Sequence, residues 1–217
     1  SCNSERKTYF RYRKRGFTFR EKGYDGLIMN EIKDINLRLS AKKGLNGEIT
    51  VPISKSYAHR VLIACALSDR PTTVNGRLIG EDIKATIDCL SSLGVVFDRK
   101  SENKTVIYPL NSIRIDRPVL NVSESGSTLR FMLPLAAALG VSARFKGSER
   151  LSKRPISELV DSLKRHGANF DREEIPFSVC GKLVPGDYEI NGEISSQYIT
   201  GLLLSLPILG KESRITV

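Results

Sequence analysis

Residues 54–60 read SKSYAHR, a run of small hydroxyl residues around one lysine that leads into an apolar helical pattern. Similar starts recur at residues 123–130, SESGSTLR, and at residues 195–200, SSQYIT. The start of a helix carries unpaired backbone N–H groups and partial positive charge, and small residues let an anion approach that backbone. Three such starts in one chain predict a site for a small, multiply anionic molecule.

Composition limits the protein class. The chain has 217 residues, of which 40% are hydrophobic and 27% charged, values typical of a globular protein with a sizeable core. No apolar run approaches the roughly 20 residues of a membrane helix, so we expect a cytoplasmic protein without a membrane partner. The net charge of +10 is uneven, because residues 1–28 hold eight Lys or Arg against three Asp or Glu.

Residues 1–28 differ from the rest by interleaving these basic residues with aromatic ones. Such a composition can bind nucleic acid. The alternative is a poorly ordered extension upstream of Met29, a plausible initiator, and we favour this extension. Residues 29–217 are then the folded domain.

The cysteines and histidines argue against a metal site. Cys65 and Cys89 fall in helical apolar patterns and are expected to be buried thiols, whereas Cys2 and Cys180 lie far from them in sequence. The chain has two histidines, so zinc coordination is not expected. We therefore expect no metal and no cofactor.

From residue 30 the pattern becomes regular. We expect strands at 34–39 and 45–51, helices at 56–67 and 81–93, and a hairpin at 95–98 and 105–108. The pattern D-x-L-x-x-x-G-x-x-F-D at residues 88–98 recurs at 161–171, and the three helix starts keep a similar spacing. The chain therefore consists of repeated α/β units of roughly 70 residues, with the third unit incomplete at Val217.

Several residues near the helix starts could bind an anion. Lys55 and Arg60 can both reach over the first helix start, which the surrounding serines should cap; the alternative is solvent-exposed charge. Gly126 leaves the backbone open, and Arg130 one turn later could face a ligand or a buried carboxylate.

The later helix starts add further candidates. Arg150, Lys153 and Arg154 precede Pro155, which suits the first turn of a helix. Ser195, Ser196 and Gln197 open the last helix and could form a phosphate nest, although ordinary capping needs one serine alone.

These motifs, in this order and spacing, resemble the 5-enolpyruvylshikimate 3-phosphate synthase family over residues 34–217. The resemblance implies transfer of the enolpyruvyl group of phosphoenolpyruvate to shikimate 3-phosphate, with release of phosphate, in aromatic amino acid biosynthesis. It implies an inside-out α/β barrel of repeated units. The family's second domain, which supplies the acid/base groups, is absent here, so the chain would carry half of a monomeric enzyme's site.

The resemblance also implies residue roles. Lys55, the catalytic lysine, would contact both substrates, and Gln197 would lie near both. Contacts to shikimate 3-phosphate would come from Ser56, Arg60, Ser195 and Ser196, with the arginine on the carboxylate. Gly126 and Arg154 would contact phosphoenolpyruvate.

Two positions depart from the family pattern. Glu124 adds a negative charge near the expected anion, and we expect it to turn away or pair with a cation. Phe131 stands where some members have proline, which could shift this helix.

Other functions stay open at this point. UDP-N-acetylglucosamine enolpyruvyl transferase shares the fold and donor but typically has Lys-Asn at 55–56. A nucleic-acid-binding repeat protein like the RNA phosphate cyclases would suit the basic arm, although a histidine suited to nucleotidylation is lacking. An inactive interaction domain is a third alternative.

Overall fold

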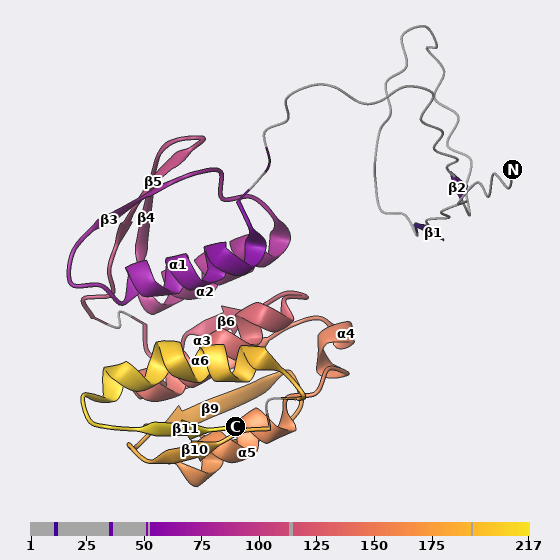
Figure 1. The fold of residues 1–217 in the computed structure, drawn as a ribbon, viewed down its shortest axis with the longest axis vertical. Coiled ribbons are helices and arrows are strands. Elements are labelled where there is room, and N and C mark those ends of the chain that lie inside the picture. The colour runs from indigo at the N-terminus through magenta and orange to yellow at the C-terminus, as the bar shows by residue number, and fades with distance from the viewer. Residues whose placement is uncertain (1–10, 13–34, 37–50, 52, 113–114, 192) are drawn as a thin grey trace, which may run out of the picture. The chain divides into compact units, whose positions relative to one another are not determined.

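The computed structural model describes residues 11–12, 35–36, 51, 53–112, 115–191 and 193–217 (Figure 1). The chain divides into two compact units, residues 1–50 and residues 51–217. In the first unit the described residues form β1 (Arg11–Tyr12) and β2 (Ile35–Asn36), which pair antiparallel. Most of the basic segment, Met29 and nearly all of the strand expected over 45–51 lie outside the described residues. Within the described ranges, no helix has the length and apolar character that crossing a membrane requires.

The second unit begins with two helices and a three-stranded sheet. Its elements are α1 (Lys55–Ala66), β3 (Thr72–Asn75), α2 (Glu81–Leu93), β4 (Val96–Ser101) and β5 (Lys104–Tyr108). The strands form an antiparallel sheet in the order β3-β5-β4. The sequence predicted α1 to within one residue at each end, predicted both ends of α2, and placed the hairpin correctly.

The chain then repeats this arrangement with additional strands. The next elements are β6 (Val119–Asn121), α3 (Gly126–Leu139), β7 (Ala143–Lys146), α4 (Glu149–Ser152), α5 (Ser157–Arg165), β8 (Ala168–Phe170) and β9 (Phe177–Gly181). They form a sheet in the order β6-β7-β9-β8, in which β6 and β7 are parallel. The last elements are β10 (Asp187–Glu189), α6 (Ser196–Ser205), the 3₁₀ helix η1 (Leu206–Leu209) and β11 (Arg214–Thr216), with β10 and β11 parallel.

This element order confirms the predicted repeat. The strands β3, β7 and β11 begin at residues 72, 143 and 214, so both intervals (143 − 72 and 214 − 143) are 71 residues. In both copies of the sequence pattern a glycine with positive φ follows the end of a helix within two residues, Gly94 at 116° and Gly167 at 101°, and an edge strand comes next. A residue with a side chain rarely adopts this backbone conformation, which explains the glycine in the pattern.

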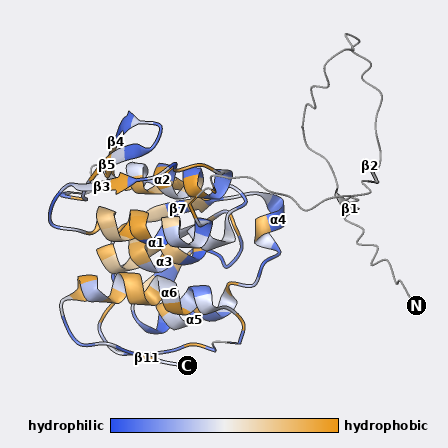
Figure 2. Cartoon of the chain, turned by 45° about the horizontal axis from the view of Figure 1, so that its top comes forward, coloured by the Kyte–Doolittle hydropathy of each residue, from blue (hydrophilic) through white to orange (hydrophobic). Residues whose placement is uncertain are grey.

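The helices of the second unit form its interior, as the inside-out fold predicts. Helix α3 packs against α2, α5 and α6 (Figure 1). Its side chains are buried on nearly every face, which fits an apolar sequence without a polar stripe. Figure 2 shows hydrophobic residues concentrated on α1, α3 and α6, whereas the tip of the β4–β5 hairpin is hydrophilic. The starts of these central helices are therefore held by a common core.

Helices α3 and α6 approach each other most closely at Gly201. A Cβ atom on Gly201 would lie 2.4 Å from the backbone oxygen of Arg130 and 3.0 Å from Pro134 Cγ. Pro134 has no N–H, so the Arg130 carbonyl lacks its usual partner within the helix and lies against the α6 backbone. Gly201 therefore sets the separation of the two helices.

We expect Gly201→Ala to destabilise the protein. Alanine would gain about 1 kcal/mol of helix propensity, but its methyl group would meet backbone that cannot rotate away, and we expect a net loss of about 1–3 kcal/mol. Urea unfolding followed by circular dichroism measures the change. Leu203→Ala, on the exposed side of the same helix, is the control and should change stability by less than about 0.5 kcal/mol. A variant at Gly201 as stable as the parent would contradict this packing.

Candidate functional site

The start of α1 places Lys55 beside an aspartate of the next helix. Lys55 Nζ lies 2.6 Å from Asp82 Oδ2. Burial by itself would raise the pKa of the Asp82 carboxyl, but the hydrogen bond and charge of Lys55 outweigh it, and the pKa stays below its ordinary value. The Ser54 side chain forms no capping hydrogen bond, so the expectation that this serine caps α1 was wrong. The Lys55 side chain is 61% exposed, which leaves its ammonium group accessible to an anion.

Arg60 connects α1 to α6. Its Nη1 donates to the carbonyl and to the hydroxyl of Ser56, both at 2.7 Å, and its Nη2 donates to Thr200 Oγ1 at 3.0 Å. Its guanidinium carbon lies 5.4 Å from the centre of the Phe131 ring. Phe131, one of the two departures from the family pattern, is buried, and its ring packs against this cation.

Two arginines converge on the start of α3. Ser125 caps this helix by accepting a hydrogen bond from the Thr128 backbone N–H. A Cβ atom on Gly126 would lie 2.9 Å from Arg154 Nη1 and 3.4 Å from Arg130 Nη1. Among the described residues neither arginine forms an ion pair. Two guanidinium groups at the positive end of a helix repel each other, and a bound anion would relieve that repulsion.

The start of α6 joins the same region. Ser195 caps the helix by accepting from the Gln197 backbone N–H at 3.3 Å. The Gln197 side-chain oxygen accepts a hydrogen bond of 2.8 Å from Arg130 Nη1, so this arginine faces a polar partner and no carboxylate. Thr200, which bonds Arg60, also donates to the Ser196 carbonyl. The starts of α1, α3 and α6 are therefore linked by side chains of the candidate residues.

Pro155 has a different role from the expected one. Helix α5 begins at Ser157 with Ile156 as its N-cap, so Pro155 lies before the helix and not in its first turn. The Pro155 carbonyl instead accepts hydrogen bonds from Arg130 Nη2 and from the Tyr198 hydroxyl. This carbonyl holds the segment that carries Arg154 against α3 and α6.

A buried chain of hydrogen bonds lies beneath these charges, and the sequence analysis missed it. His59 Nδ1 lies 2.7 Å from Thr86 Oγ1, and His59 Nε2 lies 3.2 Å from Ser127 Oγ. Thr86 Oγ1 in turn lies 2.8 Å from Thr128 Oγ1. The sequence offered one indication of this hydrogen-bond chain: His59 lies four residues after Lys55, in the motif at residues 54–60.

Burial keeps His59 neutral. Desolvation lowers its pKa below the ordinary 6.5; Asp82 acts in the opposite direction, and Lys55 and Arg60 add to the lowering. The unfolded chain then binds a proton at higher pH than the folded one does. Stability from this group is therefore fully present above about pH 6.5 and is lost as the pH falls toward the folded-state pKa.

We expect the His59→Gln variant to show a weaker dependence of stability on pH. The free energy of unfolding of the parent should fall between pH 7 and about pH 5.5, and the variant should lose part of that slope because glutamine does not titrate. Urea unfolding at a series of pH values measures both slopes. Equal slopes would mean that His59 titrates alike in the folded and unfolded chain.

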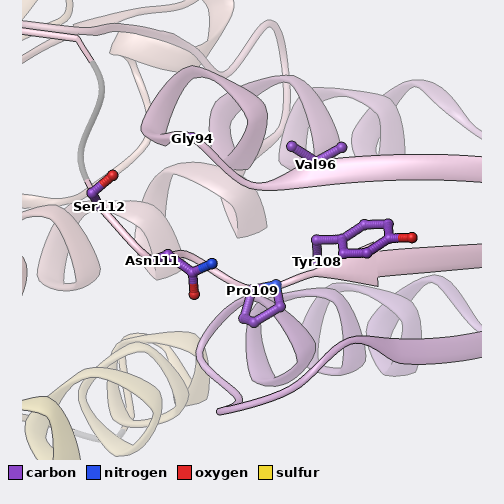
Figure 3. Close-up of a pocket in the computed structure, with 6 residues that line it drawn as sticks. All are labelled: Gly94, Val96, Tyr108, Pro109, Asn111 and Ser112. Carbon is purple, nitrogen blue, oxygen red and sulfur yellow. The ribbon is translucent and has the colours of Figure 1, made fainter.

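Other features contribute little to this site. A pocket of about 300 Å³ lies where α2 passes into β4, lined by Gly94, Val96, Tyr108, Pro109, Asn111 and Ser112 (Figure 3). It contains no charged side chain and no candidate residue. Glu124 is exposed and forms no ion pair within the described part of the chain, so it does not pair with a cation there.

The cysteines behave as structural thiols. Cys65 and Cys89 are free and buried, as predicted, and burial raises the pKa of Cys89 to about 12. Cys180 is free and exposed. No group of three or more His, Cys, Asp or Glu side chains suited to a metal ion occurs among the described residues.

Comparison with known proteins adds independent information. The family model of EPSP synthase (3-phosphoshikimate 1-carboxyvinyltransferase) matches residues 39–217. The 3-phosphoshikimate 1-carboxyvinyltransferase of Clostridium kluyveri is 38% identical over 175 residues, covering 80% of this chain and 41% of that protein. The enzyme of the same name from Clostridioides difficile is 33% identical over 184 residues, covering 80% and 42%. The chain thus spans about two fifths of the length of these curated relatives.

Solved structures agree with the sequence matches. An EPSP synthase from Acinetobacter baumannii is 26% identical and aligns with a TM-score of 0.65 over 73% of this chain and 37% of that chain. The enolpyruvyl transferase NikO from Streptomyces tendae, at 17% identity and a TM-score of 0.52, supports the fold alone. These matches favour the resemblance to the 5-enolpyruvylshikimate 3-phosphate synthase family over the two alternatives, a nucleic-acid-binding protein and a UDP-N-acetylglucosamine enolpyruvyl transferase.

Proposed function

The chain belongs to the EPSP synthase family, and from this membership we propose that it carries part of a site that transfers the enolpyruvyl group of phosphoenolpyruvate to shikimate 3-phosphate. In this reaction an acceptor hydroxyl loses its proton and adds to C2 of phosphoenolpyruvate, while the methylene carbon gains a proton. The tetrahedral intermediate then loses phosphate from C2 and a proton from the methyl group, which restores the double bond.

One observation carries the proposal: the starts of α1, α3 and α6 are linked, and four cations lie there, namely Lys55, Arg60, Arg130 and Arg154. Both substrates are multiply anionic, and helix starts with arginine and lysine side chains bind phosphate and carboxylate groups. We assign Ser56, Arg60, Ser195 and Ser196 to shikimate 3-phosphate, with Arg60 on its carboxylate. We assign Gly126 and Arg154 to phosphoenolpyruvate, and place Lys55 and Gln197 between the two.

The proton transfers require groups that we assign to a second domain. At the three helix starts the described carboxylate that forms an ion pair with a candidate residue is Asp82, which Lys55 already holds, and His59 is buried. Closure of a second domain over the substrates would supply an acid and a base and exclude water. We further propose that the complete protein is cytoplasmic and monomeric and works without metal or cofactor.

We expect the chain by itself to bind shikimate 3-phosphate weakly and to release negligible phosphate from phosphoenolpyruvate. Ground-state contacts are available, but stabilisation specific to the transition state needs the second domain. Isothermal titration calorimetry and a phosphate-release assay measure the two quantities. Arg60→Gln should weaken binding at least tenfold.

The matched control for Arg60 is Arg99→Gln, which removes the same charge from an exposed position on β4. This variant should bind as the parent does. Absence of binding by the parent, or equal loss in both variants, would refute the site assignment. Rapid turnover by the chain alone would show that its own residues transfer the protons.

We expect Gly126→Ala to weaken phosphoenolpyruvate binding with little effect on folding. The new methyl group would meet the ends of two flexible arginine side chains, which can move, so the fold should tolerate it. The same movement would carry the Arg154 guanidinium away from the start of α3. Broadening of the ³¹P resonance of phosphoenolpyruvate by the protein should decrease severalfold, while the unfolding midpoint in urea stays close to that of the parent. Unchanged broadening would place the ligand elsewhere.

A further inference from the structure

His59, on α1, contacts both α2 and α3 beneath the site. It lies one turn after Lys55 on α1, is 1% exposed, and uses both ring nitrogens, one toward Thr86 on α2 and one toward Ser127 on α3. A buried imidazole whose two nitrogens bond different helices fixes their relative positions more firmly than apolar contact does, since each broken bond would leave a buried polar atom unpaired.

The acceptor-only carbonyl at the end of this hydrogen-bond chain favours one form of the imidazole. The Thr128 hydroxyl has one proton, and the Asp82 carbonyl at 3.2 Å is a partner that can only accept; with the proton on that bond, Thr128 accepts from Thr86. Thr86 then donates to Thr128 and accepts from His59, which places the imidazole proton on Nδ1. Nε2 is left as the acceptor for the Ser127 hydroxyl.

The same ring also supports Arg60. The His59 and Phe131 rings meet edge to face, with centres 6.1 Å apart and planes at 75°, and the Arg60 guanidinium lies over the Phe131 ring. Ser127 directly follows Gly126, the residue approached by Arg154. One buried side chain is therefore in contact with the supports of both proposed subsites.

We propose that His59 is a positioning residue that holds the start of α3, with Gly126, in register with the start of α1, with Lys55. This inference rests on the proposed function, because it explains how cations from two repeats can bind the same pair of substrates. Binding of phosphoenolpyruvate depends on the starts of both α1 and α3. Shikimate 3-phosphate depends mainly on α1 and α6, which Arg60 and Thr200 connect directly.

The test compares His59→Leu, His59→Gln and Thr86→Val with the parent chain. Thr86 has no proposed contact with substrate, and its valine variant keeps the side-chain shape while removing the partner of Nδ1. Thr105→Val, a buried threonine on β5 outside this network, is the matched control. Leucine at position 59 should weaken phosphoenolpyruvate binding at least tenfold in ³¹P titrations but change the calorimetric affinity for shikimate 3-phosphate less than threefold.

The other variants should separate positioning from general stability. Glutamine can reach Ser127 in place of Nε2 and should restore most of the lost affinity, and Thr86→Val should show a smaller defect of the same kind. The control should bind both ligands as the parent does. A parallel loss of both affinities in proportion to stability, or a defect in Thr105→Val, would overturn the inference.

A measurement without ligand separates this inference from the proposed function. Amide resonances of Gly126 and Ser127 should move in His59→Leu and Thr86→Val and stay in place in Thr105→Val, and ¹⁵N spectra should show the His59 proton on Nδ1. If the parent binds neither ligand, the proposed function fails, and these spectra still decide the positioning role. Unmoved amides, or a proton on Nε2, would refute that role.

Discussion

The contact between α6 and α3 at Gly201 is the constraint on which the rest of the second unit depends. It brings two helix backbones together at a point where Pro134 has removed an internal hydrogen bond, and a methyl group would not fit. Because both helices are rigid, the contact also fixes the distance between their starts. At that separation Arg130 donates a hydrogen bond to Gln197. The geometry of a charged surface region is thus set by an uncharged contact in the interior.

The cations at the three helix starts are held by neutral partners more than by carboxylates. Arg130 bonds an amide and a backbone carbonyl, and Arg60 bonds hydroxyl groups and a carbonyl while resting on an aromatic ring. Such contacts orient a guanidinium group without neutralising it. The positive potential therefore persists at the helix starts, where it can act on an anion. Lys55 is the exception, and its exposed pair with Asp82 costs little to exchange for a ligand.

The helices of the site have two layers: an outer layer that carries the charges and an inner layer that fixes the positions of the helices. The outer layer carries the cations, two of which lie against the buried Gly126, whereas the inner layer carries His59, Thr86 and Thr128 in a connected chain. The inner polar groups are buried with their partners satisfied, which favours a single arrangement of the helices. The repeated architecture makes this division possible, because each repeat delivers a helix start to the same central region.

Much of the local structure could be predicted from the amino-acid sequence. Apolar spacing and terminating glycines predicted α1, α2 and the β4–β5 hairpin, and a pattern recurring after 73 residues predicted the repeat, because these signals depend on neighbours along the chain. The motif order also indicated the residues of the candidate site. The contacts that support these residues depend on the folded chain, because they join distant positions: His59 contacts Ser127 across 68 residues, and Arg60 contacts Thr200 across 140. Pro155 shows the same limit, since a residue type suited to the first turn takes that role only where packing places the helix boundary beside it. Ser54 stands at the boundary of α1, yet its side chain forms no capping hydrogen bond.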